Sequence, residues 1–138
     1  MTLLLDTNVV SELRKPRPDP NLAAWAATIT KRAAFISVVT IREIEAGVLL
    51  VERRDADQGR LLRAWLEERV LLEYADRLLD VDLAVARRAA ALHVPDPRPE
   101  RDALIAATAL THGLTVVTRN TSDFAPMGVA ILNPWTDR

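Results

Sequence analysis

The feature that most constrains this chain is an alternation between short apolar runs and stretches with helical periodicity. Five apolar runs indicate buried strands, at residues 3–5, 34–39, 78–81, 114–118 and 129–132. Strands that alternate with helices predict an α/β domain of three layers, in which helices cover both faces of a mostly parallel sheet. The two most apolar runs, 3–5 and 114–118, belong in the sheet interior, so we expect a five-stranded sheet in the order 3-2-1-4-5.

Capping residues predict where helices begin between these strands. Asp19, Asp55 and Asp82 each precede a stretch of helical spacing, as expected of N-caps. Thr40 and Glu43 have the spacing of a capping box, which predicts a helix that opens at Thr40. A further helix is expected over residues 100–112, closed by a glycine; its residues 103–110 are apolar or small on nearly every side, so it should be buried.

Composition excludes several kinds of protein. At 138 residues the chain has the size of one domain, and we interpret residues 1–138 as a single domain. The absence of cysteine excludes disulfides, zinc–thiolate sites and a thiol nucleophile. A net charge of -1 argues against a broad basic surface for nucleic acid, although arginine groups such as Arg98 and Arg101 could form a local basic rim. No run approaches the roughly 18 apolar residues of a membrane span, so a cytoplasmic protein is expected.

Four acidic residues fall where predicted strands give way to helices or turns, or in the first turn of a predicted helix: Asp6, Glu43, Asp102 and Asp123. Because the carboxyl ends of parallel strands meet at one edge of a sheet, we expect these side chains to converge there. Each acid alone could serve as a helix cap or a turn residue. Together they would repel one another unless a cation were present. Carboxylate ligands without cysteine indicate a hard divalent cation, and so metal-dependent phosphoryl chemistry.

The segments around these acids carry a family resemblance. They read LLLDTNVVSEL at residues 3–13, SVVTIRE at 37–43 with Gly47 four residues on, DALIAATA at 102–109 and TRNTSDF at 118–124. In this order and at these separations they resemble the motifs of PIN-domain ribonucleases, and more narrowly those of VapC and FitB-like toxins of bacterial toxin–antitoxin operons. One departure is the charged stretch before Asp102, where Glu100 or Arg101 could alter contacts with substrate or partner.

The resemblance implies a Mg²⁺- or Mn²⁺-dependent endoribonuclease that cleaves structured RNA, with tRNA as the candidate, and leaves 5′-phosphate and 3′-hydroxyl ends. The metal-binding and catalytic acids would be Asp6, Glu43, Asp102 and Asp123. Supporting polar residues would be Thr7, Thr118 and Asn120. We also expect a homodimer restrained by a small VapB-like antitoxin, because Trp25, Trp65 and the apolar positions of the helices over residues 19–54 exceed the needs of a small core. Such an antitoxin could silence the site by inserting an arginine among the carboxylates.

Two alternatives remain at this level. A HAD-type phosphatase also begins with a strand ending in Asp, but it needs a second Asp two residues on, where this chain has Asn8. A PIN fold retained as an RNA-binding scaffold without catalysis is the other alternative, and the presence of all four acids argues against it. The two histidines, His93 and His112, are expected at helix ends and are poor candidates for an acid–base pair.

Overall fold

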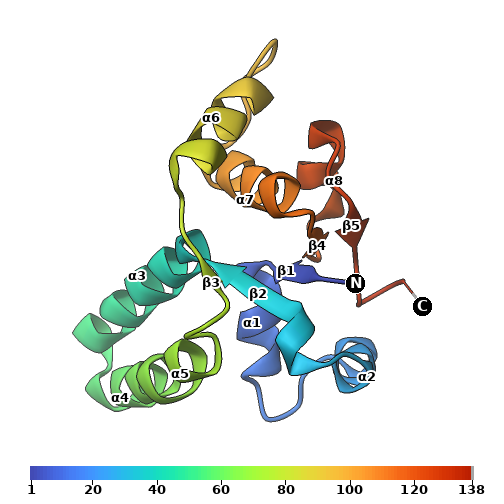
Figure 1. Ribbon diagram of the computed structural model, residues 1–138. Helices are drawn as coiled ribbons and strands as arrows, with labels where there is room; N and C mark the ends of the chain where they lie inside the picture. The colour runs from blue at the N-terminus through green and yellow to red at the C-terminus, as the bar shows by residue number, and fades with distance from the viewer. Residues whose placement is uncertain (138) are drawn as a thin grey trace.

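A computed structural model describes residues 1–137 and shows a parallel five-stranded sheet in the order β3-β2-β1-β4-β5 (Figure 1). The strands are β1 (Leu3–Leu5), β2 (Ala34–Ser37), β3 (Leu78–Leu79), β4 (Thr115–Val117) and β5 (Ile131–Leu132). β1 pairs with β2 on one side and with β4 on the other. The predicted strand order is therefore confirmed, and β1 lies in the middle of the sheet.

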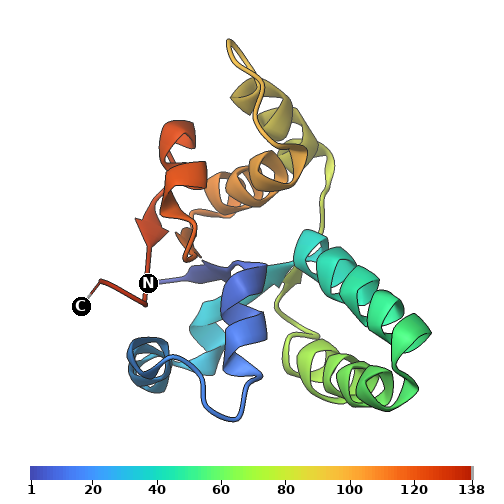
Figure 2. The ribbon, with the colours of Figure 1, turned by 180° about the vertical axis from the view of Figure 1, so that it is seen from behind.

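Helices cover both faces of the sheet, as the two opposite views show (Figures 1 and 2). One face carries α1 (Thr7–Leu13), α2 (Pro20–Thr28), α3 (Val38–Arg54), α4 (Ala56–Trp65), the π-helical turn η2 (Leu66–Val70) and α5 (Leu71–Glu73). The other carries α6 (Leu83–Leu92), α7 (Glu100–His112) and α8 (Thr121–Phe124). Short 3-10 turns, η1 (Lys31–Ala33) and η3 (Ala125–Met127), complete the chain. The predicted three-layer α/β architecture is confirmed.

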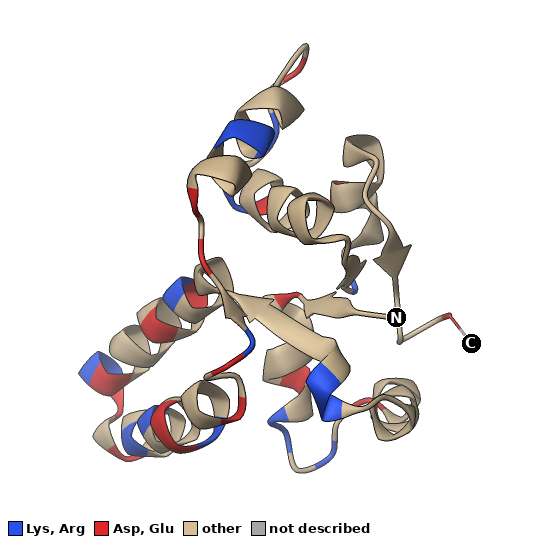
Figure 3. Ribbon diagram, viewed as in Figure 1, with Lys and Arg blue, Asp and Glu red and all other residues tan. Residues whose placement is uncertain are grey.

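The helices α3 to α5, residues 38–73, project from the sheet as an arm, and acidic and basic residues alternate along it (Figure 3). Arg63 of α4 pairs with Glu45 and Glu52 of α3 and with Glu67 of η2. These ion pairs tie the helices of the arm together. Among residues 1–137, none of the helices combines the length and the apolar character needed to cross a bilayer.

Alternate side chains of β1 enter two different cores, because successive residues of a strand point to opposite faces. Leu3 and Leu5 pack with residues of α1 to α4, such as Leu22 and Ile44. Leu4 packs on the other face with α7, η3 and their neighbours. Because both faces of the sheet are covered, the strands are apolar throughout, which is why their runs were visible in the sequence.

The buried helix predicted over residues 100–112 is α7, and it is covered on two sides. Ala103 and Ala106 pack toward the sheet, while Ala107 packs against Val85 and Ala89 of α6. Gly113 ends the helix in the left-handed conformation, at φ 68, as the sequence predicted. The small side chains of α7 therefore allow it to lie between the sheet and another helix.

Three predicted caps are confirmed, and one prediction is wrong. The side chains of Asp19, Asp55 and Asp82 accept backbone N–H groups in the first turns of α2, α4 and α6. The predicted capping box at Thr40 does not exist, because Ser37, at the end of β2, caps α3 by accepting from the Val39 N–H at 3.0 Å. The helix thus starts earlier than predicted, which leaves the Glu43 side chain available for other contacts.

Arg77, which the sequence analysis did not single out, links two distant parts of the chain. Its guanidinium is 5% exposed and donates to the backbone carbonyls of Lys31, Ala34 and Glu73. The distances to Ala34 and Glu73 are both 2.6 Å. The guanidinium carbon also lies 4.9 Å from the centre of the Tyr74 ring. Arg77 therefore connects the start of β2 to the segment that follows α5.

Candidate active site

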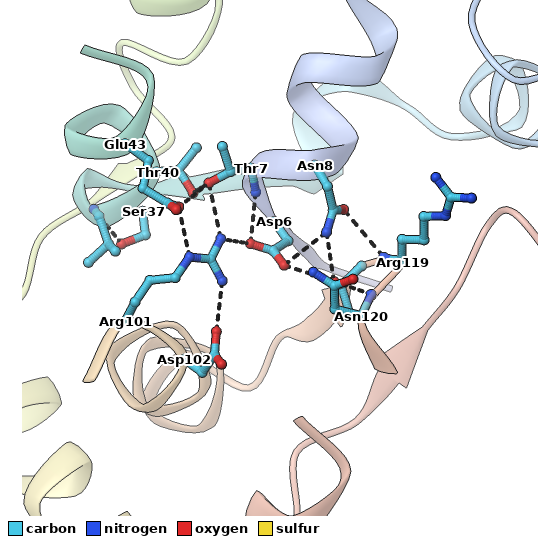
Figure 4. A network of polar contacts seen from close by, with 12 residues as sticks. Asp6, Thr7, Asn8, Ser37, Thr40, Glu43, Arg101, Asp102, Arg119 and Asn120 are labelled. Carbon is cyan, nitrogen blue, oxygen red and sulfur yellow. Dashed lines mark hydrogen bonds and ion pairs between the residues drawn. The ribbon is translucent and has the colours of Figure 1, made fainter. Parts of the chain in front are cut away.

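Asp6 lies at the centre of a polar cluster at the carboxyl edge of the sheet (Figure 4). β1 leads directly into α1, and the buried Asp6 caps this helix by accepting from the Thr7 N–H at 2.8 Å. Its second oxygen accepts from the Thr118 hydroxyl at 2.7 Å and from the Asn8 amide at 3.4 Å. Both carboxylate oxygens are therefore fixed in position by donors from two neighbouring strand ends.

Thr118 joins the end of β4 to this cluster. Besides donating to Asp6, its hydroxyl accepts from the Asn8 side chain at 3.2 Å and from the Asn120 N–H at 3.0 Å. Asn120 therefore contributes a backbone group to this network, while Thr118 contributes a side chain. Asn8 was missed as a site residue in the sequence. The available signal was its place two residues after Asp6, in the first turn of α1, where its side chain can reach back to the strand end.

Glu43 reaches the same edge from α3. Its Oε1 accepts from the Thr7 hydroxyl at 2.6 Å, and the Thr40 hydroxyl lies 3.1 Å from that of Thr7. Thr40 and Glu43 are three residues apart in the helix, so both side chains face α1. Thr7 therefore holds Glu43 in place, next to Asp6.

Arg101 lies between three of the predicted site acids, as Figure 4 shows. Its Nε donates to Glu43 at 2.8 Å, Nη1 donates to Asp102 at 2.9 Å, and Nη2 donates to Asp6. Nη2 also lies 3.2 Å from the Thr7 hydroxyl. One side chain from the first turn of α7 thus connects α3, α7 and the end of β1. The sequence allowed Arg101 a place in a local basic rim, and the structure shows that it points into the acidic cluster.

The acidic surroundings keep Arg101 charged. Burial alone would lower the pKa of Arg101, but the hydrogen bond and the negative charge of Asp6 oppose this, and Asp102 and Glu43 add to them. The net result is a pKa above the ordinary value for arginine. Three formal negative charges still face one positive charge. The cluster therefore still attracts a second cation, or one of higher charge in place of the guanidinium.

Asp123, the fourth predicted acid, lies in α8 with an exposed side chain. Within residues 1–137, no three acidic or histidine side chains are arranged to hold a metal ion. The metal set of four acids therefore stays a prediction: Asp6, Glu43 and Asp102 are brought together, but around a guanidinium. The histidines lie at helix ends as expected, since His93 follows α6 and His112 ends α7, far along that helix from Asp102.

These features define a class of protein: an α/β fold with carboxylates gathered at the carboxyl edge of a parallel sheet. The family model that matches describes the PIN domain and covers residues 3–128. The chain belongs to the PIN-domain family. This confirms the family suggested by the four sequence segments.

Relatives match along nearly the whole chain. The protein is 36% identical to Toxin FitB of Neisseria gonorrhoeae, with 98% of this chain and 99% of the relative covered. It is 37% identical to VapC ribonuclease Y4jK of Sinorhizobium fredii, with 96% and 97% covered.

Solved structures agree with these matches. The crystal structure of FitAcB from Neisseria gonorrhoeae superposes with a TM-score of 0.90 at 34% identity, covering 98% of this chain and 99% of that one. A toxin–antitoxin complex from Klebsiella pneumoniae superposes with a TM-score of 0.68 at 26% identity, covering 96% and 98%. Membership of the PIN family removes the support for a HAD-type phosphatase.

Proposed function

We propose that the protein is a divalent-metal-dependent endoribonuclease that acts as the toxin of a VapBC-type toxin–antitoxin pair in the cytoplasm. The observation that carries this proposal is the gathering of Asp6, Glu43 and Asp102 around one cation at the carboxyl edge of the sheet. The relatives that match the full chain bear the names of a toxin and of a VapC ribonuclease, which supports the same reaction.

The residues of the cluster suit Mg²⁺ or Mn²⁺. All of the candidate ligands are carboxylate oxygens, which these hard ions prefer, and the cluster already binds a positive group. Asp6, Glu43 and Asp102 would hold the ion, with Asp123 reaching in from α8. When bound, such an ion lowers the pKa of a water molecule and stabilises negative charge on the scissile phosphate.

The chain's own polar residues orient these acids. Thr118 and Asn8 donate to one oxygen of Asp6, and Thr7 donates to Glu43, so the carboxylates are held in fixed directions before substrate arrives. Positioned groups of this kind do not have to reorganise during the reaction, which is an advantage for catalysis. The chain has no cysteine, and the histidine ion pair found in the described chain joins His93 to Glu100 and not to an acid of the cluster, so water rather than a side chain is the proposed nucleophile.

The proposed substrate is a structured RNA, with tRNA as the candidate that the family suggests. Arg119 supports a phosphate contact next to the site, because it is exposed, its N–H donates to Asn8 at 3.3 Å, and its guanidinium lies 5.6 Å from the Trp135 ring centre. Aromatic residues are only 4% of the chain, so recognition by an extended platform for base stacking is not expected.

The proposed protein partners are a small antitoxin and a second copy of the chain. An apolar groove of about 600 Å³ opens between α1, α2 and the arm, lined by Val10, Leu13, Trp25, Trp65, Leu72 and Tyr74. Leu49, Leu50 and Leu61 of the arm are also exposed. Exposed apolar groups of this kind favour burial against another protein.

Incubation of the antitoxin-free protein with total bacterial RNA tests the proposal. We expect cleavage with Mg²⁺ or Mn²⁺, no cleavage with a chelator, and 5′-phosphate ends at the cleavage sites. Growth arrest on expression should disappear when the cognate antitoxin is co-expressed. Tight RNA binding with no cleavage in either metal would instead support the scaffold alternative.

A further inference from the structure

Three acids that the proposed function assigns to metal binding already have a cation, and it belongs to the chain itself. The guanidinium of Arg101 contacts Asp6 Oδ1, Glu43 Oε1 and Asp102 Oδ1, so each acid offers one oxygen to it. These acids come from the end of β1, from α3 and from α7, and Arg101 is the group that joins all three.

The guanidinium and a metal ion cannot use these oxygens at the same time. Arginine has only donors, and its hydrogen bonds to Glu43 and Asp102 are 2.8 and 2.9 Å long. A Mg²⁺ ion requires oxygens at about 2.0–2.1 Å in a compact octahedral arrangement. A planar guanidinium is much larger, and it occupies the space between these oxygens that the ion would need.

Arg101 has room to leave. Its side chain is 30% exposed, whereas Asp6 is fully buried, so the arginine lies on the solvent side of the cluster. Its backbone belongs to the first turn of α7, a helix that is packed on two sides. A rotation of the long arginine side chain can therefore empty the cluster without movement of the helix.

We propose that Arg101 is a built-in competitor of the metal ion: it holds the three carboxylates together in the metal-free protein and has to swing out before Mg²⁺ or Mn²⁺ binds. This inference rests on the proposed metal-dependent function. The metal-free protein is then stable but inactive, because its own arginine balances the acids that the reaction needs. An arginine inserted by an antitoxin would occupy the position among the three carboxylates that Arg101 of the chain itself already occupies.

Removal of Arg101 has two opposite consequences on this account. The metal-free protein loses the only cation in contact with the three carboxylates within the described chain, so their mutual repulsion lowers its melting temperature. The metal ion, in contrast, meets a more negative site without a competitor, so it binds more tightly. A purely structural arginine would produce the first effect without the second.

Calorimetric titration of Mn²⁺ into the antitoxin-free protein and into Arg101→Met tests this prediction. We expect the Kd for Mn²⁺ to fall by at least about tenfold in Arg101→Met, equivalent to about 1.4 kcal/mol. The melting temperature in chelator should fall, and the rise caused by Mn²⁺ should be larger than in the wild type. Arg42→Met is the matched control, since it removes one positive charge from an exposed position beside Glu43, and its Kd should stay within about twofold of wild type.

The wild-type protein offers a second measurement, which does not depend on the folding of a variant. The Arg101 Nε–H group donates to Glu43, so its NMR cross-peak should move during a Mg²⁺ titration, with the same midpoint as the backbone amide of Thr7. A cross-peak that stays in place while the Thr7 amide responds would overturn the inference.

The outcomes separate this inference from the proposed function. An unchanged or weaker Mn²⁺ affinity in Arg101→Met, together with metal-dependent RNA cleavage by the wild type, would overturn the role of Arg101 and leave the function standing. No metal binding by either protein, together with cleavage that survives a chelator, would overturn both.

Discussion

Two arginines with opposite surroundings divide this molecule into a part that maintains the fold and a part that carries the site. Arg77 is 5% exposed and donates mainly to backbone carbonyls, at the junction of η1, β2 and the end of α5. Arg101 is more exposed and donates to the side chains of three acids at the carboxyl edge of the sheet. Arg77 also contacts the carboxylates of Glu73 and Asp76, and its buried Nε has no hydrogen-bond partner within residues 1–137, but its shortest contacts are to carbonyls, whereas those of Arg101 are to carboxylates.

The kind of acceptor decides what each arginine can do. Backbone carbonyls are neutral and fixed by the surrounding structure, so the Arg77 contacts are permanent and replacing them leaves buried acceptors without a donor. Carboxylates are charged, so another cation can take over the contacts of Arg101. Burial of an arginine is therefore no sign of function by itself; the acceptors distinguish the two cases.

The largest expected effect is on the site. Asp6→Asn removes one negative charge from the cluster while the side chain keeps its shape and can still cap α1. If bound ions contribute about 4 kcal/mol to the transition state, RNA cleavage should fall about a thousandfold. Single-turnover cleavage rates measure this. Asp57→Asn, an exposed acid of α4 that pairs with Arg60, is the control and should retain full activity; equal rates for both variants would remove Asp6 from the mechanism.

The next largest effect is on the fold. Arg77→Met removes the side-chain donor to the carbonyls of Lys31, Ala34 and Glu73, of which Lys31 keeps the Ala34 N–H, so the free energy of unfolding should fall by about 3 kcal/mol. Urea denaturation followed by circular dichroism measures it. The exposed Arg32, which pairs with Asp76, is the control, and Arg32→Met should cost less than about 1 kcal/mol. A loss of stability for Arg77→Met as small as that for Arg32→Met would show that Arg77 does not maintain the fold.

A smaller effect is expected from Thr118, which orients Asp6. Thr118→Val keeps the volume but removes the hydroxyl that donates to Asp6 at 2.7 Å, so cleavage should slow by about tenfold, as for loss of about 1.4 kcal/mol. Thr108→Val is the matched control, because the Thr108 hydroxyl is in α7 and donates to the Leu104 carbonyl. Similar rates for the two variants would mean that the orientation of Asp6 does not limit the reaction.

The smallest effect is a pH dependence next to Arg77. Burial raises the pKa of Tyr74, Arg77 acts in the opposite direction, and Glu73 raises it further. The neutral phenol is therefore favoured in the folded protein, and its contribution to stability is complete below about pH 10, the ordinary pKa of tyrosine, and is lost as pH rises through the raised value. The melting temperature, measured from pH 8 upward, should fall at the alkaline end. The size of the fall should correspond to the ionisation of a single group.

Tyr74→Phe isolates this contribution from that of the lysines, which titrate in the same range. Its alkaline decrease in melting temperature should be shallower than that of the wild type. Because Tyr74 is the single tyrosine of the chain, tyrosinate absorbance reports on it alone. A tyrosinate transition at the ordinary value would contradict the raised pKa.

Much of the fold was predictable because its strands are buried on both faces. The apolar run that ends just before Asp6 and the run that begins at Leu114 located the central strands. Aspartates such as Asp82 marked the starts of helices. The start of α3 was mispredicted because Ser37 and Thr40 are both good caps, and only the end of β2 decides between them. Local pattern cannot show where a short strand stops pairing.

The site was predictable only in part. The positions of Asp6, Glu43 and Asp102 at one edge follow from the topology of a parallel sheet, which a sequence pattern can reveal. The insertion of Arg101 could not be predicted, since it depends on the rotamer of one long side chain among several possible acceptors. Asn8 and Arg77 each have one partner near in sequence, but the contacts to Thr118 and Lys31 lie far away in sequence and could not be predicted from local pattern.

The small side chains of α7 set the distance of this helix from the sheet and from α6, and thereby the position of its first turn in the site. Ala103 and Ala106 face the sheet and Ala107 faces α6, so there is no spare room on either side of the helix. A bulkier residue at any of these positions has to shift the helix axis, and with it the first turn that carries Arg101 and Asp102. On the proposed account, single methyl groups that never touch the acidic cluster can thus adjust the balance between Arg101 and a metal ion within it.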